Sequence, residues 1–178
     1  MTLAAWWREE PLTRRCDRAR FDCGVAVLNE YLQRYARQNH ESGGAKAFVA
    51  LPLDGSATVL GYYTISPGAI EFEKVPSSIT RKLARYEVPV FRLGRLAVAV
   101  TAQGRGLGGD LLLAAGARAL AVAGSVGGVA LAIDAKDRRA ATWYERFGAM
   151  RLIDDPLKLV LPLEMLRDAL GLRERVNS

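Results

Sequence analysis

The stretch Gln103–Asp110, with the sequence QGRGLGGD, has the residue types of a loop that binds phosphate. Half of its residues are glycine, and Arg105 lies among them. Glycine lets an anion approach the backbone because no Cβ intervenes. A helix that begins there adds outward-pointing amides and the positive end of its dipole. We therefore predict an anion site built from a strand, this loop and a helix; the alternative is a glycine-rich helix start that serves only close packing.

The spacing of Gly104, Gly106 and Gly109 also matches G-x-G-x-x-G, the fingerprint of dinucleotide-binding folds. Asp134, which follows the next predicted strand, is a passable candidate for the acid that binds the ribose in such folds. After Ile133, however, only one helix and one strand are predicted before the terminal helix. This leaves no room for a doubly wound parallel sheet, and no Gly-Lys-Ser/Thr follows the glycines to make a P-loop.

Hydrophobic periodicity predicts the elements that precede the loop. A helix is expected after Asp22 or Cys23, either of which would sit near its cap, and residues 42–44 would end it. Strands at 45–51 and 59–65 would form an antiparallel hairpin around the turn at Asp54-Gly55, with a break at 66–68 and an extension over 69–72. The apolar stripe of the helix would consist of Val25, Leu28, Leu32 and Tyr35.

The later part of the chain alternates between helix and strand. The apolar run at 129–133 predicts a strand covered on both faces, and with the strand at 89–100 it would complete one β-α-β unit around the helix at 104–123. The sequence therefore predicts one domain of mixed α and β structure. The other elements expected here are a short basic helix at 77–86, a helix at 140–147, a strand at 157–163 and a helix at 164–170.

The chain carries a formal charge of +6, and this excess is unevenly distributed. Arg81 to Arg105 alone contains six basic residues and one acid. Such a segment favours an anionic partner, either nucleic acid or a phosphorylated cofactor, although a solvated face is the simpler reading. No apolar run is expected to be long enough to cross a membrane, so a cytoplasmic protein is predicted.

Cysteine and histidine usage restricts the possible chemistry. Cys16 and Cys23 are too few for a disulfide scaffold and lack the partners of a zinc site, so both are predicted to be reduced thiols. His40 is the single histidine. This argues against a histidine-based triad and excludes a site of several histidines, so no metal is expected.

Several stretches resemble the GNAT N-acetyltransferases. Gln103–Gly108 matches Q/R-x-x-G-x-G/A, the acetyl-coenzyme A loop of that family. The resemblance covers about Phe21 to Leu163 and is strongest to the GNAT toxins of bacterial type II toxin–antitoxin systems. It implies an α+β GNAT fold, a splayed and mostly antiparallel central sheet flanked by helices, as a single domain over residues 1–178. Further stretches match in order, at Phe21–Leu32, Gly61–Ser66, Arg95–Val98 and Ala141–Gly148.

The resemblance also implies which residues bind acetyl-CoA. Loop amides would hold the diphosphate, Gly104 would shape the turn, and the preceding strand would pair with the pantetheine arm. The implied set is Leu96, Ala97, Val98, Gln103, Gly104, Arg105, Gly106, Leu107, Gly108, Gly109, Asp134 and Phe147.

Tyr144 resembles the tyrosine that protonates the departing thiolate in these enzymes. A phenol, whose pKa is near 10, stays protonated at neutral pH and can donate to the sulfur. On the sequence pattern alone, Tyr144 fits a core residue of an amphipathic helix better than it fits a catalytic residue. No general base is obvious, since His40 and Glu71 are only weak candidates. An α-amino group has a pKa near 8 and is partly neutral without a base, so the missing base favours an α-amine acceptor.

Because the related toxins acetylate the amino acid on charged tRNA and so block translation, the resemblance implies aminoacyl-tRNA as acceptor. It also implies a cognate antitoxin of the ribbon-helix-helix type, contact with DNA only through that antitoxin, and a homodimer. Two alternatives stay open: a GNAT enzyme that acts on a protein or small-molecule amine, and a GNAT-like domain without activity that binds nucleic acid or a regulator. Residues predicted to contact tRNA are Arg34, Arg37, Lys46, Arg81, Lys82, Arg85, Arg92 and Arg95.

Overall fold

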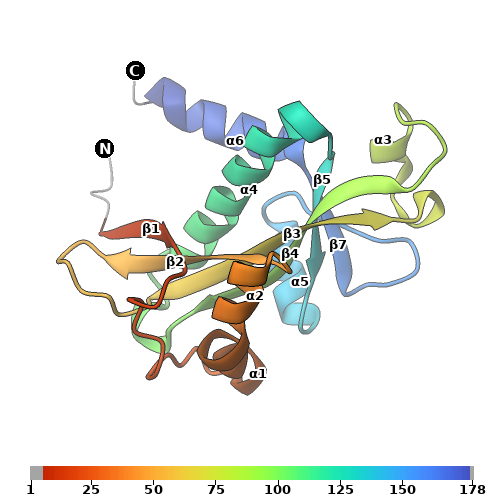
Figure 1. The fold of residues 1–178 in the computed structure, drawn as a ribbon. Helices are drawn as coiled ribbons and strands as arrows, with labels where there is room; N and C mark the ends of the chain where they lie inside the picture. The colour runs from red at the N-terminus through yellow and green to blue at the C-terminus, as the bar shows by residue number, and fades with distance from the viewer. Residues whose placement is uncertain (1–5, 177–178) are drawn as a thin grey trace. The chain divides into compact units, whose positions relative to one another are not determined.

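Figure 1 shows the computed structural model of the chain, which describes residues 6–176, with side chains described to residue 171. The chain divides into two compact units. The first comprises Ser66 and the residues before it together with Arg95–Ala114; the second comprises Pro67–Gly94 and the residues from Ala115 onward. The strands hydrogen-bond in the order β1-β2-β3-β4-β5-β7-β6. The fold is thus of the α+β class, as the sequence predicts.

The first unit contains an antiparallel sheet. β2 (Lys46–Pro52) pairs with β3 (Gly61–Ile70), which confirms the predicted hairpin. β1 (Trp7–Pro11) runs antiparallel along the other edge of β2, as Figure 1 shows, and was not predicted. Core side chains from β2 and β3, including Val49 and Tyr62, pack with the helical segment that follows Gly24.

That helical segment is interrupted by a π-helical turn. α1 (Ala26–Glu30) continues through η1 (Tyr31–Tyr35) into α2 (Ala36–Ser42), and Gly43 ends it at a φ of 84°. A π turn holds one residue more than an α turn, which changes the direction of the side chains at its end. Tyr35, the last residue of the turn, is 54% exposed, and its predicted place in the apolar stripe is wrong. Ala36 is buried instead.

Asp22 and Cys23 lie near the cap of this helix, as predicted, although neither occupies the N-cap position itself. The residue at the N-cap position is Val25, and its side chain makes no capping hydrogen bond. The Asp22 carboxylate instead accepts hydrogen bonds from the Gly24 amide at 2.8 Å and the Asn29 side chain at 3.0 Å. These two donors lower the pKa of Asp22 and close the turn before the helix.

The second unit contains the parallel pair. β4 (Val88–Val98) pairs in parallel with β5 (Ala130–Asp134), which confirms the predicted β-α-β unit. β5 pairs antiparallel with β7 (Lys158–Pro162), and β7 pairs with β6 (Met150–Arg151), a strand that the sequence did not predict. The remaining helices of this unit are α3 (Ser77–Thr80), α5 (Arg138–Glu145) and α6 (Leu163–Val176).

Two predictions near the start of the second unit are wrong. β3 continues through Pro67 and Gly68 to Ile70, although a break was expected there. Gly68 serves close approach, because a Cβ on it would lie 2.7 Å from Nε of Arg92. The basic helix expected over 77–86 ends at Thr80, and turns and bends follow it. Short 3-10 turns lie at η2 (Phe72–Lys74) and η3 (Val100–Ala102).

α4 (Leu107–Val126) follows the glycine loop and has residues in both units. By length and composition it is apolar enough to cross a membrane, contrary to the expectation from the sequence. Leu111, Leu112 and Ala115 are each 0% exposed. Burial of this kind is what a core helix shows, and core helices pass the same length and composition criteria.

Candidate functional site

The glycine loop has the backbone geometry that only glycine adopts readily. Gly104 and Gly106 have φ values of 78° and 82°, in the left-handed region that a Cβ disfavours. A Cβ built on either would meet no other described atom within 4 Å. The two glycines are therefore required by backbone conformation, and they leave the surface of the loop open. This is the arrangement expected of a loop that an anion approaches closely.

Gln103 fixes the start of the loop. Its side-chain Nε2 donates to the carbonyl of Val98 at 2.9 Å and to that of Cys23 at 3.2 Å. Both donors of this amide are thus directed at the protein's own backbone. Gln103 therefore shapes the loop, and its side chain has only its carbonyl left for a ligand.

The loop leads directly into the N-terminus of α4. The Asp110 amide donates to the Gly106 carbonyl at 3.1 Å, which opens the hydrogen-bond ladder of the helix. Amides before this point, those of Leu107, Gly108 and Gly109, belong to the first turn, whose N–H groups have no partner within the helix. The Leu107 side chain is 1% exposed, so only its backbone could touch a ligand.

The strand segment before the loop is Leu96, Ala97 and Val98, at the end of β4. The parallel ladder with β5 runs from Val90 to Leu93, and β4 continues past it. Ala97 is buried and Val98 half-buried. The resemblance implies that this segment pairs with a pantetheine arm. Its backbone groups lie beyond the end of the ladder between β4 and β5.

Arg105 lies exposed in the loop with its guanidinium over the ring of Trp6, 3.5 Å from Cζ to the ring centroid. Sequence reasoning did not assign a role to Trp6. The sequence signal for it is the pair of adjacent tryptophans, Trp6 and Trp7.

Tyr144 lies on α5 in the second unit. The Asp137 carboxylate caps this helix by accepting from the Ala140 amide at 2.8 Å, which lowers the pKa of Asp137. Tyr144 is only 8% exposed, and burial raises its pKa above the usual value. Trp143 packs edge-on against it, with ring centroids 4.9 Å apart, and against Phe147 at 4.8 Å. Tyr144 is thus a fixed, protonated phenol.

Asp134 lines a pocket of about 390 Å³ in the second unit. Lys158 is its cross-strand neighbour on β7. Lys74, in the same pocket, bridges Glu71 at 3.7 Å and Asp154 at 3.6 Å. Glu71 is therefore engaged in an ion pair, which weakens its candidacy as a general base.

His40 also has a structural role. Its Nδ1 accepts a hydrogen bond from the Ala47 amide at 2.9 Å, and burial together with Lys46 lowers its pKa. A neutral ring committed to Ala47 is a poor general base. Neither Cys16 nor Cys23 forms a disulfide, as predicted, and both side chains are buried.

The predicted tRNA contacts fall in both units. In the first, Arg34 pairs with Glu30 at 3.4 Å and Arg37 with Glu41 at 3.8 Å, both along the helical segment. Lys46 donates to the His40 carbonyl at 2.9 Å. Arg95 is half-buried, its guanidinium 3.5 Å from the centroid of the Tyr31 ring.

In the second unit, Arg81, Lys82 and Arg85 are exposed in the turn that follows α3. Arg85 lies 6.0 Å from the Phe72 ring centroid. Arg92 donates to the Ala69 carbonyl at 3.3 Å. Arg81, Lys82 and Arg85 thus share one exposed turn, whereas Arg92 is engaged by the backbone of β3.

Comparison with known proteins identifies the family of this chain. The tRNA-acetylating toxin of Mycobacterium tuberculosis (strain ATCC 25618 / H37Rv) is 35% identical over 151 residues, which is 85% of this chain and 89% of the relative. No protein-family model matches.

Solved structures also match this chain over most of its length. A Tyr-to-Phe mutant of KacT superposes with a TM-score of 0.87 at 26% identity, over 93% of this chain and 99% of that one. AtaT complexed with acetyl-methionyl-tRNAfMet gives a TM-score of 0.86 at 27% identity, over 92% and 99%. A mutant AtaT toxin bound to acetyl-CoA and to the C-terminus of its antitoxin AtaR gives 0.75 at 26% identity, over 90% and 95%. With the sequence relative covering most of both chains, these matches establish that this chain belongs to the tRNA-acetylating toxins, which have the GNAT fold.

Proposed function

We propose that this protein transfers the acetyl group of acetyl-CoA to the α-amino group of an aminoacyl-tRNA and thereby blocks translation. The observation that carries the proposal is the open glycine loop, with left-handed Gly104 and Gly106, at the N-terminus of α4. A backbone of this shape favours a diphosphate. Family membership supports the acceptor, because the relative from Mycobacterium tuberculosis is a tRNA-acetylating toxin.

In the proposed reaction the amine nitrogen attacks the thioester carbonyl carbon, and the carbon–sulfur bond breaks. The sulfur leaves as a thiolate that takes up a proton, and the amine releases one proton to solvent, so that an amide and free coenzyme A are formed. We assign Tyr144 as the donor to that sulfur. Burial raises the pKa of Tyr144, which keeps its proton in place as a hydrogen-bond donor at neutral pH. Acetyl-CoA supplies the activated acetyl group.

His40 and Glu71, the two candidate general bases, are both engaged in other contacts, which favours an acceptor amine that is already partly neutral at pH 7. His40 is held by Ala47 and Glu71 by Lys74. An α-amine with a pKa near 8 needs less help than a lysine side chain near 10.4. The α-amine of an aminoacyl ester meets that requirement.

The wider assignments follow from the same family. We propose that the two units form one catalytic domain, since β3, β4 and α4 have residues in both. A solved AtaT mutant is bound to its antitoxin, and we propose a cognate antitoxin here, of the ribbon-helix-helix type, through which alone the toxin would reach DNA. We further propose a homodimer that acts in the cytoplasm, where charged tRNA is found.

Labelled acetyl-CoA and a panel of charged tRNAs test the proposed function. Label is expected in the aminoacyl group of at least one charged tRNA, and none in uncharged tRNA, because only the aminoacyl ester carries an α-amine. Label that enters proteins or small amines but never tRNA would favour a GNAT enzyme of another specificity. Failure of the protein to bind acetyl-CoA in calorimetry would favour a domain without activity.

Gly106 offers a test of the acetyl-CoA loop. Gly106→Ala places a Cβ at a φ of 82°, at a cost of roughly 1–2 kcal/mol, so the loop should move or open. We expect the Kd for acetyl-CoA to rise by about tenfold, measured by calorimetry.

Gly124 is the matched control, because it lies in α4 with open space around its Cβ position and an ordinary φ. Gly124→Ala should leave acetyl-CoA binding unchanged and raise stability by about 0.5–1 kcal/mol, as expected for a helix interior. Equal binding by both variants would show that the loop conformation does not matter to the cofactor.

A further inference from the structure

The beginning of the described chain contacts the glycine loop at two points. The Trp6 ring lies under the Arg105 guanidinium, 3.5 Å from its Cζ. Trp7 donates from its indole Nε1 to a carboxylate oxygen of Asp110 at 3.4 Å. Arg105 belongs to the loop and Asp110 to the first turn of α4. Two consecutive tryptophans therefore meet the two ends of the candidate anion site.

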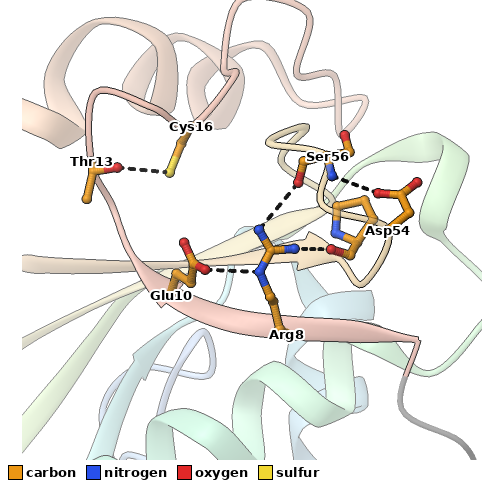
Figure 2. A network of polar contacts seen from close by, with 7 residues as sticks. Arg8, Glu10, Thr13, Cys16, Asp54 and Ser56 are labelled. Carbon is orange, nitrogen blue, oxygen red and sulfur yellow. Dashed lines mark hydrogen bonds and ion pairs between the residues drawn. The ribbon is translucent and has the colours of Figure 1, made fainter.

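These tryptophans are held by an anchored strand. Figure 2 shows Arg8 of β1 between Glu10 and Ser56. Arg8 donates to Glu10 at 2.9 Å, to the carbonyl of Pro52 at the end of β2, and to the carbonyl of Ser56 in the turn that follows. The next residue of β1, Glu9, accepts from the Tyr63 hydroxyl at 3.0 Å. Side chains of β1 are thus fixed on both sides of the strand, and Trp6 immediately precedes it.

Stacking on Trp6 prepares Arg105 for a phosphate. An indole under the guanidinium covers its face and attracts its charge, while the N–H donors point outward from the edge in the plane of the group. The edge is the part that forms paired hydrogen bonds with phosphate oxygens. Arginine has considerable rotamer freedom to lose, and a guanidinium already in contact with an indole ring loses less of it when a ligand binds.

We propose that Trp6 is a positioning residue of the acetyl-CoA site, holding Arg105 in the orientation that binds the diphosphate, and that β1 is therefore part of the cofactor site. The inference rests on the proposed function, since it assumes that the anion at the glycine loop is the diphosphate of coenzyme A. Trp7 and Asp110 supply the second attachment, which keeps the segment beside the first turn of α4.

The primary test measures steady-state kinetics with acetyl-CoA at saturating charged tRNA. Trp6→Ala should raise the KM for acetyl-CoA by roughly threefold to thirtyfold, the range that a cation–π contact is worth, and leave kcat unchanged. Trp6→Phe should recover part of the loss, because a phenyl ring still carries the guanidinium. Tyr86→Ala, which removes a 79% exposed aromatic side chain, is the matched control and should behave as the wild type.

Two further arms separate positioning from a general structural role. The double variant Trp6→Ala/Arg105→Ala should bind acetyl-CoA no more weakly than Arg105→Ala alone, because Trp6 acts through Arg105. With acetyl-pantetheine, which lacks the diphosphate, Trp6→Ala and the wild type should perform equally.

Each contrary outcome has a distinct meaning. An unchanged KM in Trp6→Ala, additive losses in the double variant, or an equal loss with acetyl-pantetheine would overturn the role assigned to Trp6. A wild-type protein that fails to bind acetyl-CoA would instead overturn the proposed function. Circular dichroism of Trp6→Phe and Trp6→Ala establishes that each variant is folded before its kinetics are compared.

Discussion

Tyr144→Phe should lower kcat for acetylation of charged tRNA by about 10²- to 10⁴-fold, the usual contribution of a positioned proton donor. The substitution removes one hydroxyl from a side chain that is 8% exposed and packed against Trp143. Shape and packing are retained, so the KM for acetyl-CoA should not change. Single-turnover measurements with labelled acetyl-CoA would separate the chemical step from binding and product release.

The pH dependence provides a second measurement on Tyr144. Burial raises the pKa of this phenol from its ordinary value near 10, so its proton remains below about pH 10. The profile of kcat/KM should therefore rise through about pH 8, as the acceptor α-ammonium loses its proton, and should not fall again below about pH 10. A descending limb near neutrality would show that another group supplies the proton.

Tyr62→Phe is the matched control for Tyr144→Phe. Tyr62 is also a buried tyrosine with a raised pKa, and its hydroxyl donates to the Leu28 carbonyl at 2.7 Å. Its loss should reduce stability by about 0.5–1.5 kcal/mol without changing kcat. If Tyr144→Phe acetylated tRNA at the wild-type rate, the assignment of Tyr144 as proton donor would be wrong.

Removing the exposed basic cluster Arg81, Lys82 and Arg85 should weaken tRNA binding by about a hundredfold near physiological salt, because each phosphate contact releases counterions. The three side chains follow one another in an exposed turn, so the triple alanine variant should fold normally. A plot of the logarithm of affinity against the logarithm of salt concentration should also be less steep for the variant, its slope being smaller in magnitude by about two to three.

The matched control removes the same charge elsewhere. Arg14, Arg15 and Arg20 are exposed and lie outside the predicted tRNA set, so their triple alanine variant should lose far less affinity. Filter binding with non-hydrolysable charged tRNA at several salt concentrations would measure both variants. Equal losses would mean that only the net charge of the protein matters, and that the turn after α3 is not a specific contact.

The sequence predicted the elements that its own side-chain pattern determines. The hairpin of β2 and β3, the parallel pair of β4 and β5, and the helix that carries Tyr144 are all present. In each case the alternation or run of apolar residues is strong and local. The glycine loop was likewise recognisable, because Gly104 and Gly106 take a conformation that few other residues adopt.

The wrong or missing predictions concern segments whose structure depends on residues elsewhere in the chain. β1 has no apolar alternation, and it is a strand because the edge of β2 accepts it. The break expected at Pro67-Gly68 is absent because β3 continues there, with the Arg92 side chain lying close over Gly68. Trp6 was left unassigned because its partner, Arg105, is distant in sequence. The acceptor could be reached only through resemblance, since no pattern of residues specifies tRNA.

The π-helical turn at Tyr31–Tyr35 joins α1 and α2 into one helical stretch. Leu28 before the turn and Ala36 after it pack against the same hydrophobic core, and Leu32 inside the turn is 0% exposed. A π turn spaces its hydrogen bonds over five residues instead of four. The stretch therefore accommodates one residue more than a regular α-helix would hold here, while the residues on both sides of the turn stay anchored to the core.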